Sequence, residues 1–347
     1  MSNSRKHYKR KSSHKVVMAV CTIFVFAAAV IGYVFYTPMS KSSETEYLLI
    51  DADDNIDSVY VKLEPLATKH SFWAFKKLSQ WKNYSQHIKT GRYEIGGEGA
   101  LQTFRHIRNG IQASVNLTIR SVRTKDKLAS DIAKKLMLSK EEIVTALSDP
   151  QTCNEYGYNP ETIISMFIPN TYDLYWNVSV KALLERMHKE NKKFWTLERL
   201  EKAKATGLSP TEVVTLASIV DEETANEAEM PKIAGMYLNR LKIGMLLQAD
   251  PTVKYANKNF EARRIYNSML TIDNPYNTYK YKGLPPGPIR IPSLASIDAV
   301  LNYVHHDYLY MCAKEDFSGT HNFAKTYAEH QQNAAKYAKA LNERGIK

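Results

Sequence analysis

The chain has 347 residues, of which 44% are hydrophobic and 24% are charged, a composition typical of folded domains rather than of disordered chains. This length allows one large domain or two ordinary ones, each with a sizeable core. The formal net charge is +11, and six of the positive charges lie in the acid-free residues 1–15. Without those six, a charge of +5 remains, which is ordinary for a surface and gives little support to a nucleic-acid partner.

The next segment, Val16–Tyr36, contains no charged residue and is long enough to cross a bilayer, which takes about 20 residues. Basic flanks stay on the cytoplasmic side, and interfacial aromatics such as Tyr33 and Tyr36 belong at the membrane surface. A cleaved signal peptide is the alternative, but its apolar region would be shorter and would end in small residues. We predict a single-pass anchor in the cytoplasmic (inner) membrane, with the N-terminus cytoplasmic and everything after residue 37 periplasmic or extracytoplasmic.

Residues 37–46 form a short polar linker, and the following stretch predicts a small α+β module over 47–120. A short amphipathic helix is expected at 101–110, because the pattern ends at Gly110. The runs rich in β-branched and aromatic residues predict strands. These strands are expected at 47–53, 58–63, 89–95 and 113–122.

From about residue 125 the helical period dominates, as in 125–138, where Leu128, Ile132 and Leu136 share one face. Capping signals predict a helix start at Ser139 and another at Ser209, which is followed by proline. Further helices are expected at 181–195, 208–229, 230–244 and 325–341, interrupted by a proline- and glycine-rich stretch at 274–293. The predicted fold class is α+β: a transmembrane helix (16–36), the small module (47–120) and a mostly helical domain with short strands (121–347).

Motifs that are missing from the sequence restrict the chemistry. The patterns of zinc proteases, serine hydrolases and P-loop nucleotidases do not occur, nor does C-x-x-C. Cys21 lies in the predicted anchor, so Cys153 and Cys312 are the only pair that could form a bridge outside it, and the sequence leaves that bridge open. These absences weigh against a zinc protease, a serine hydrolase and a nucleotide triphosphatase.

Three consecutive acids, Asp221, Glu222 and Glu223, follow an apolar run. On a helix of about 100° per residue, Glu223 falls on the apolar arc, whereas Asp221 and Glu222 fall to either side and are expected to face water. A carboxyl group on an apolar face has a raised pKa, as a general acid at neutral pH requires. The alternative is structural: a buried glutamate paired with an arginine or a backbone N–H. The pattern alone leaves both open.

Two other acids share that arc, one at each end of the helix. Glu212 lies three residues after Ser209 and can close a capping box. Glu227 lies close to Pro231, where the helix is expected to end, so we expect it to be solvated.

Amide, hydroxyl and aromatic side chains are frequent downstream of Glu223, in the segments 237–241 (with Asn239 and Arg240), 246–255, 275–279 and 321–323. Each segment alone is compatible with a turn or a core tyrosine. Together they suit a groove for a sugar chain, because sugars need planar hydrogen-bonding groups and aromatic faces.

Several ordered blocks of this sequence resemble the endolytic murein transglycosylase family, also called the MltG or YceG-like family. The blocks are FIPNTYDLYW (167–176), LASIVDEET (216–224), IAGMYLNRLKIGMLLQADPTVKYA (233–256), YNTYKYKGLPPGPI (276–289) and HNFAKTYAEH (321–330). The module before them is similar, more weakly, to the family's LysM-like subdomain through GRYEI and its position.

The resemblance implies an enzyme that cleaves the β-1,4 bond between N-acetylmuramic acid and N-acetylglucosamine and closes a 1,6-anhydro ring without metal or cofactor. The family's catalytic residue is the second acid of an E-x-E-T pattern, which is Glu223 here; the first acid is replaced by Asp221. It also implies action on nascent peptidoglycan strands, termination of their elongation, and a partnership with peptidoglycan synthases such as penicillin-binding proteins. The candidate substrate-binding residues are Gln248, Asp250, Thr252, Tyr276, Asn277, Thr278 and His321.

Two other functions remain open from the sequence. One is a hydrolytic muramidase in which Asp250 or Glu222 activates water. The other is a non-catalytic peptidoglycan-binding protein or division scaffold that keeps the fold.

Overall fold

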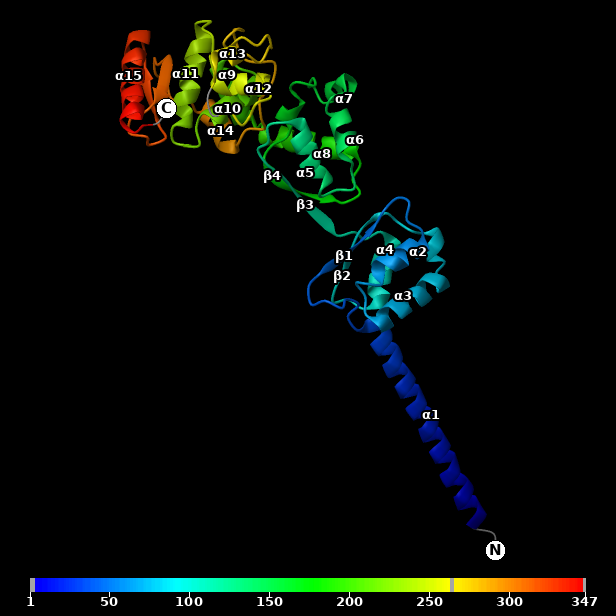
Figure 1. Cartoon of the computed structure of the whole chain (residues 1–347). Helices are drawn as coiled ribbons and strands as arrows, with labels where there is room; N and C mark the ends of the chain where they lie inside the picture. The colour runs from blue at the N-terminus through cyan, green and yellow to red at the C-terminus, as the bar shows by residue number, and fades with distance from the viewer. Residues whose placement is uncertain (1–3, 263–264, 346–347) are drawn as a thin grey trace. The chain divides into compact units, whose positions relative to one another are not determined.

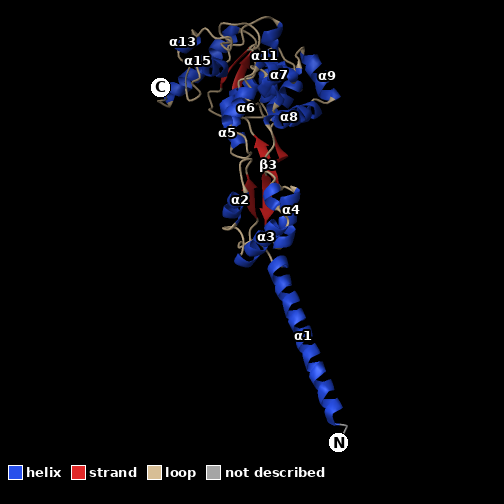
Figure 2. Cartoon of the chain, turned by 90° about the vertical axis from the view of Figure 1, so that its right-hand side faces the viewer, coloured by secondary structure: helices blue, strands red, loops and turns tan. Residues whose placement is uncertain are grey.

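The computed structural model describes residues 4–262 and 265–345 (Figure 1). The chain divides into two compact units. Unit 1 comprises residues 1–115 with 173–177, and unit 2 comprises residues 116–172 with 178–347. Helices predominate over strands in both units (Figure 2), so the predicted mixture of helix and sheet is confirmed.

Unit 1 begins with the long helix α1 (Ser4–Tyr36). Its segment His14–Tyr36 is long and apolar enough to cross a membrane, and it is the only such segment among the described residues. Large side chains such as Phe24 and Phe26 are more than two-thirds exposed. The segment is therefore not packed in a protein core and contains the predicted span Val16–Tyr36.

The rest of unit 1 packs three helices against a two-stranded antiparallel sheet. Strand β1 (Glu46–Ile50) pairs with β2 (Gly91–Ile95) so that Leu48 lies opposite Tyr93. The helices are α2 (Ile56–Leu63), α3 (Lys69–Trp81) and α4 (Ala100–Asn109), with a 3-10 turn η1 (Tyr84–Gln86). This mixed unit agrees in class with the expected α+β module, while its likeness to a LysM module stays a prediction.

One strand expected in this unit is a helix. Residues 58–63 lie in α2, because Asn55 caps the helix through the backbone N–H groups of Asp57 and Ser58. Val59 and Leu63, four residues apart, are then buried together on one helical face. In contrast, α4 ends at Gly110 as predicted, with the φ of +76° that glycine adopts readily.

Two further strands, β3 (Ser114–Ile119) and β4 (Asn170–Tyr175), form a second two-stranded sheet. The boundary between the two units passes through both strands. Unit 2 contains the helices α5 (Lys125–Ala133), α6 (Lys140–Ala146), α7 (Pro150–Glu155), α8 (Val180–Phe194), α9 (Leu197–Thr206), α12 (Asp250–Ala256) and α13 (Asn267–Leu270), with a 3-10 turn η2 (Ile163–Met166), in addition to those of its core.

The core of unit 2 is centred on α10 (Pro210–Glu223), which packs against α11 (Met230–Lys242) and α14 (Leu294–Leu301). Residues 213–220 of α10 are all buried, so the helix is enclosed on every side. Its start is as predicted, with Ser209 as N-cap, Pro210 at N1 and a capping box with Glu212. Its end is earlier than predicted: Thr224 is extended, at φ −150° and ψ 142°, so Glu223 is the last helical residue.

The end of the chain adds a hairpin and a helix to unit 2. Strands β5 (Tyr310–Ala313) and β6 (His321–Ala324) pair antiparallel, with Cys312 opposite Asn322. Helix α15 (Tyr327–Glu343) packs against both strands. Cys312 and Cys153 are both free thiols, so the bridge that the sequence left open is not formed.

Candidate active site

Glu223 stands at the C-terminal end of α10, where the core meets a cavity. Its Oε1 accepts a 2.6 Å hydrogen bond from the hydroxyl of Tyr237 on α11. Burial raises the pKa of the Glu223 carboxyl to about 7, and the nearby charge of Asp250 adds to the rise, while the Tyr237 hydrogen bond opposes it. A carboxyl group with this pKa holds and releases a proton near neutral pH.

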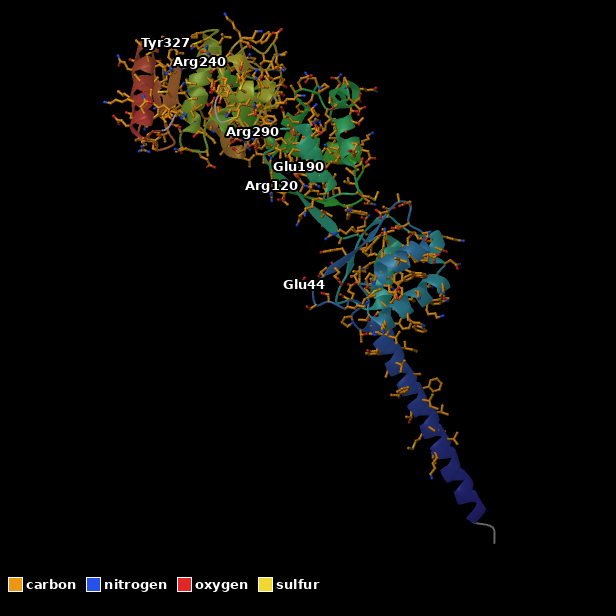
Figure 3. All side chains as sticks on the ribbon, in the orientation of Figure 1. Glu44, Arg120, Glu190, Arg240, Arg290 and Tyr327 are labelled. Carbon is orange, nitrogen blue, oxygen red and sulfur yellow. The ribbon has the colours of Figure 1, made fainter. Side chains whose placement is uncertain are left out.

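The cavity has a volume of about 350 Å³ and is walled by five elements of unit 2. Helices α10 and α11, the start of α12, the β5–β6 hairpin and α15 each contribute side chains; Arg240 and Tyr327 are labelled in Figure 3. The lining residues are Glu223, Met236, Tyr237, Arg240, Gln248, Asp250, Tyr279, Tyr310, Met311, Cys312, Ala313, His321, Tyr327 and His330. The chain therefore brings residues more than a hundred positions apart, such as Glu223 and His330, around one carboxyl group.

Tyr237 holds the carboxyl of Glu223 as a neutral donor. The side chain is almost fully buried, and burial together with the Glu223 charge raises the phenol's pKa well above its usual value. The hydroxyl therefore keeps its proton and donates it in the hydrogen bond at any physiological pH. Sequence analysis did not find this residue, because a tyrosine among apolar residues on a helix also fits a packing role.

Arg240 brings a positive charge into the same wall of the cavity. Its Nε donates to Leu309 O at 2.6 Å and its Nη1 to Leu247 O at 2.6 Å. These carbonyls neutralise no charge, so the buried guanidinium keeps its full electrostatic effect, and it lowers the pKa of Glu223. The sequence showed Arg240 only as one of many polar residues downstream of Glu223.

His321, a candidate from the sequence, lies in the cavity and is held by a buried acid, Glu229. Glu229 Oε2 lies 2.8 Å from His321 Nδ1, and its Oε1 accepts from the His321 backbone N–H at 2.7 Å. This two-point contact fixes the ring and assigns the Nδ1 proton, which leaves Nε2 free to bond other groups. Glu229 is the N-cap residue of α11, and nothing in its sequence context marked it.

Gln248 and Asp250, two further candidates, also line the cavity. Gln248 has a left-handed φ of +47°, and its backbone N–H donates to Thr278 O. Asp250 opens α12, and its Oδ1 accepts a 2.6 Å hydrogen bond from the hydroxyl of Tyr279. Both side chains are exposed, so they are available to a ligand.

The remaining candidates do not line the cavity, which corrects the expectation of direct sugar contact. Thr252, Asn277 and Thr278 are buried with at most 1% of their surface exposed. Their side chains bond within the protein: Thr252 Oγ1 and Thr278 Oγ1 lie 2.8 Å apart, and Asn277 Nδ2 donates to two backbone carbonyls. Tyr276 packs against Tyr255. In this structure the hydrogen bonds of Thr252, Asn277 and Thr278 hold the two segments that carry Gln248 and Tyr279.

The expectation that Asp221 and Glu222 face water is wrong. Their side chains are 8% and 14% exposed, because two arginines cover them. Arg290 reaches both acids, with Nε 3.1 Å from Asp221 Oδ2 and Nη1 2.9 Å from Glu222 Oε1. Arg123 makes a two-pronged contact with Glu222 at 2.6 and 2.9 Å. The helical spacing describes one helix alone, so it contains no information on Arg290 and Arg123, which come from other parts of the chain. The expectation for Glu227 holds, since it is exposed.

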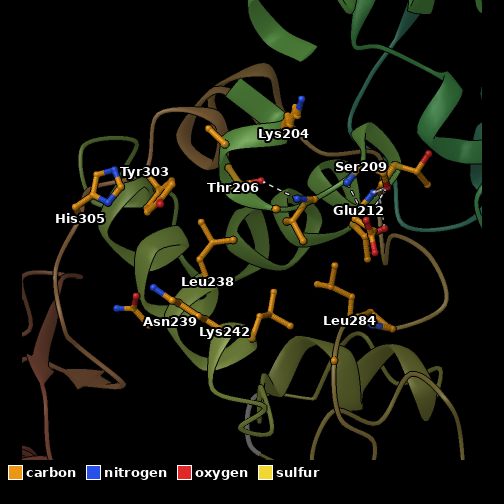
Figure 4. A pocket seen from close by; sticks show the side chains of 18 of the residues that line it. Lys204, Thr206, Ser209, Glu212, Leu238, Asn239, Lys242, Leu284, Tyr303 and His305 are labelled. Carbon is orange, nitrogen blue, oxygen red and sulfur yellow. Dashed lines mark hydrogen bonds between the residues drawn. The ribbon is translucent and has the colours of Figure 1, made fainter. Parts of the chain in front are cut away.

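A larger cavity, of about 1440 Å³, lies at the other end of α10 (Figure 4). Figure 4 shows Glu212 in its wall beside Ser209. The Glu212 carboxylate accepts hydrogen bonds from the backbone N–H and the hydroxyl of Ser209. The Glu212 side chain thus serves to cap α10. Within the described part of the chain, no group of three or more His, Cys, Asp or Glu side chains is placed to hold a metal.

The chain is similar to known proteins over most of its length. The chain is 28% identical to the endolytic murein transglycosylase of Bacillus subtilis strain 168, over 93% of each chain. It is 24% identical to the protein of the same name from Streptococcus pneumoniae R6, over 83% of this chain and 57% of that one. A crystal structure of a YceG-like protein from Listeria monocytogenes superposes with a TM-score of 0.55, at 27% identity, over 84% of this chain and 99% of that one. The profile of the YceG-like family matches residues 48–336, and the chain belongs to this family.

Proposed function

We propose that the protein is a membrane-anchored lytic transglycosylase that cleaves the β-1,4 bond between N-acetylmuramic acid and N-acetylglucosamine in peptidoglycan, with Glu223 as its acid and base. The observation that carries the proposal is the Glu223 carboxyl, buried beside a cavity with a pKa of about 7. The relatives named endolytic murein transglycosylase support the choice of substrate.

In the first step Glu223 acts as a general acid. A carboxyl group whose pKa is raised to about 7 is present in both its protonated and its ionised form near neutral pH, so the proton is available for transfer. Tyr237 bonds Oε1, which leaves Oε2 as the oxygen that delivers the proton to the glycosidic oxygen. The bond from the muramic C1 to that oxygen then breaks, and positive charge develops at C1.

In the second step the Glu223 carboxylate acts as a base. It takes the proton from the C6 hydroxyl of the same muramic residue, and the C6 oxygen attacks C1 to close the 1,6-anhydro ring. The nucleophile belongs to the substrate, so one carboxyl group serves where most glycosidases use two. Glu223 ends the cycle protonated, as it began.

Other residues of the cavity stabilise and orient the sugar in this proposal. The carboxylate of Asp250 offers negative charge to the developing cation, and Tyr279 fixes its position. Gln248 and His321 supply hydrogen bonds to the sugar's polar groups. The rings of Tyr310 and Tyr327, whose centroids lie 5.8 Å apart, offer aromatic faces. The sugar is not contacted by Thr252, Tyr276, Asn277 or Thr278 in this proposal. Their effect on the reaction is indirect, through the segments that carry Gln248 and Tyr279.

The cellular setting belongs to the same proposal. Helix α1 anchors the protein in the cytoplasmic membrane, with residues 1–15 inside and the rest of the chain outside, where peptidoglycan lies. Cleavage there would act on nascent strands, end their elongation and bring the protein into contact with peptidoglycan synthases such as penicillin-binding proteins. The segment 47–120 would serve as a LysM-like module and 121–347 as the catalytic domain.

A hydrolytic muramidase is the second candidate, because Asp250 lines the same cavity and could activate a water molecule. Glu222 is a poorer base for that role, since Arg123 and Arg290 already bind it. The test is to digest purified glycan strands with the full chain and to weigh the products. A product lighter by one water than the hydrolytic one supports the transglycosylase, and the heavier product overturns it. A scaffold protein would give neither.

A further inference from the structure

Helix α3 of unit 1 exposes an unusual face. Lys69, Trp73, Lys77 and Trp81 follow one another at intervals of four residues, so they form one stripe along the helix. All four are exposed, Trp73 to 51% and Trp81 to 73%. The opposite face carries Phe72, Phe75 and Leu78 and is buried in the core of the unit. The stripe is therefore not packed against any other element in the described part of the chain.

The composition of this stripe points to a particular kind of partner. Two tryptophans, half of the chain's four, remain in contact with water, which costs free energy that burial would recover. Helix α3 contains no acidic residue, and Lys82 directly follows it. The Lys82 ammonium lies 3.9 Å from the centre of the Trp81 ring and that of Lys77 5.9 Å from the Trp73 ring. Paired indoles and lysines suit a surface that is apolar below and negatively charged above.

The place of α3 in the fold identifies that surface. The Tyr33 ring near the end of α1 stacks on His70 of α3 with centroids 4.6 Å apart, and His70 Nε2 lies 2.8 Å from Thr37 Oγ1. Figures 1 and 2 both show α3 beside the end of α1. The segment able to cross a membrane ends at Tyr36, so α3 lies at the level where an anchored chain would leave the bilayer.

We propose that the stripe Lys69–Trp73–Lys77–Trp81 docks on the outer surface of the same membrane, with the indoles between headgroups and acyl chains and the lysines on anionic lipid phosphates. The inference rests on the proposed anchoring by α1. Tryptophan rings favour this interfacial layer because they are apolar yet carry an N–H donor. The contact would give unit 1 a second attachment and fix its orientation on the bilayer, which a single helix leaves free to rotate.

The test uses the full chain in vesicles of phosphatidylcholine whose acyl chains carry bromine, with or without phosphatidylglycerol. Bromine quenches tryptophan fluorescence only at close range. Trp176→Phe and Trp195→Phe are introduced so that Trp73 and Trp81 supply the whole signal. We expect strong quenching, and we expect Lys69→Glu with Lys77→Glu to remove most of it in the phosphatidylglycerol vesicles. Lysine-to-arginine changes at the same two positions should retain it.

The matched control reverses two exposed lysines that are also eight residues apart, Lys181 and Lys189 on α8, and should leave quenching unchanged. Vesicle flotation tests the anchor separately. A chain that floats but shows no quenching overturns the docking proposal and leaves the anchor intact. A chain that does not float overturns both. Tryptophans that are unquenched by bromine but shielded from an aqueous quencher would indicate a protein partner and overturn the proposal.

Discussion

The three neighbouring acids at the end of α10 face two different environments. Asp221 and Glu222 meet guanidinium groups from Arg290 and Arg123, whereas Glu223 meets a phenol and a cavity. An opposite charge at 3 Å favours the ionised form of a carboxyl group, and burial without one favours the protonated form. Asp221 and Glu222 are engaged by arginines and can hold the helix end in place, while Glu223, whose pKa is raised to about 7, can transfer a proton. One-residue steps along a helix are enough to separate a structural role from a chemical one.

The largest effect should come from removing the proton of Glu223. Glu223→Gln keeps the size of the side chain but cannot donate and take back a proton, so we expect kcat on glycan strands to fall about 10³-fold. Glu227→Gln is the matched control, because Glu227 is an exposed acid four residues further on, and it should retain activity. A Glu223→Gln enzyme with the wild-type rate would show that the proton comes from elsewhere.

The second-largest effect should be a loss of stability, and it concerns the contacts of Asp221 and Glu222. Arg290→Met removes a guanidinium that contacts both Asp221 and Glu222, leaving largely buried carboxylates with less compensation. We expect a loss of about 3 kcal/mol in the free energy of unfolding, measured by denaturant titration at pH 7. If the two acids were solvated as an isolated helix suggests, the loss would be close to zero.

The pH dependence of stability should distinguish Glu223 from its neighbours. The folded-state pKa of Glu223 is raised from 4.5 to about 7, so the folded chain holds this proton more tightly than the unfolded one. The stability that this proton contributes is full below pH 4.5 and is lost as the pH rises through 7. The Glu223→Gln variant has no titratable group at this position, so its stability does not fall in this way as the pH rises. Relative to the wild type it should gain about 1–2 kcal/mol between pH 4.5 and pH 8, allowing for the solvent-exposed part of the group.

The unfolding free energies of both proteins, measured at a series of pH values, check this prediction. A difference that does not change with pH would mean that Glu223 titrates as an ordinary surface glutamate. A difference of opposite sign would mean that the folded chain holds Glu223 ionised.

The smallest effect should follow Tyr237→Phe. The Tyr237 hydrogen bond lowers the pKa of Glu223, so without it that pKa should rise. Because the reaction starts from protonated Glu223, the alkaline limb of the pH profile of kcat/KM should then move to higher pH. We expect a loss of about tenfold in kcat/KM at neutral pH, the usual cost of one hydrogen bond to a charged group. A purely structural tyrosine would lower stability or activity without moving the profile.

Local signals predicted much of the helical fold. The caps at Ser139 and Ser209 and the glycine at Gly110 mark helix ends in the structure, because these signals act within one turn. The helix at 58–63 was missed, since its valines and tyrosine also suit a strand, and the cap at Asn55 decided the outcome.

The candidate site could be predicted only in part. Local helical spacing places Glu223 on the apolar face of its helix. The sequence blocks that resemble the YceG-like family point to Gln248, Asp250 and His321 as candidates. Tyr237 and Glu229 act through contacts of 2.6 and 2.8 Å across different elements, and spacing along the chain carries no information on them. For the same reason, the buried role of Asn277 could not be distinguished from sugar binding.

The most direct test of the central claim is a digest of purified glycan strands by the full chain in water enriched in heavy oxygen. If Glu223 passes the proton and the substrate supplies its own C6 oxygen, the new muramic ends should be anhydro rings that contain no heavy oxygen, and Glu223→Gln should form none. Ends that carry one heavy oxygen atom for each bond cleaved would contradict the account, because water would then be the nucleophile.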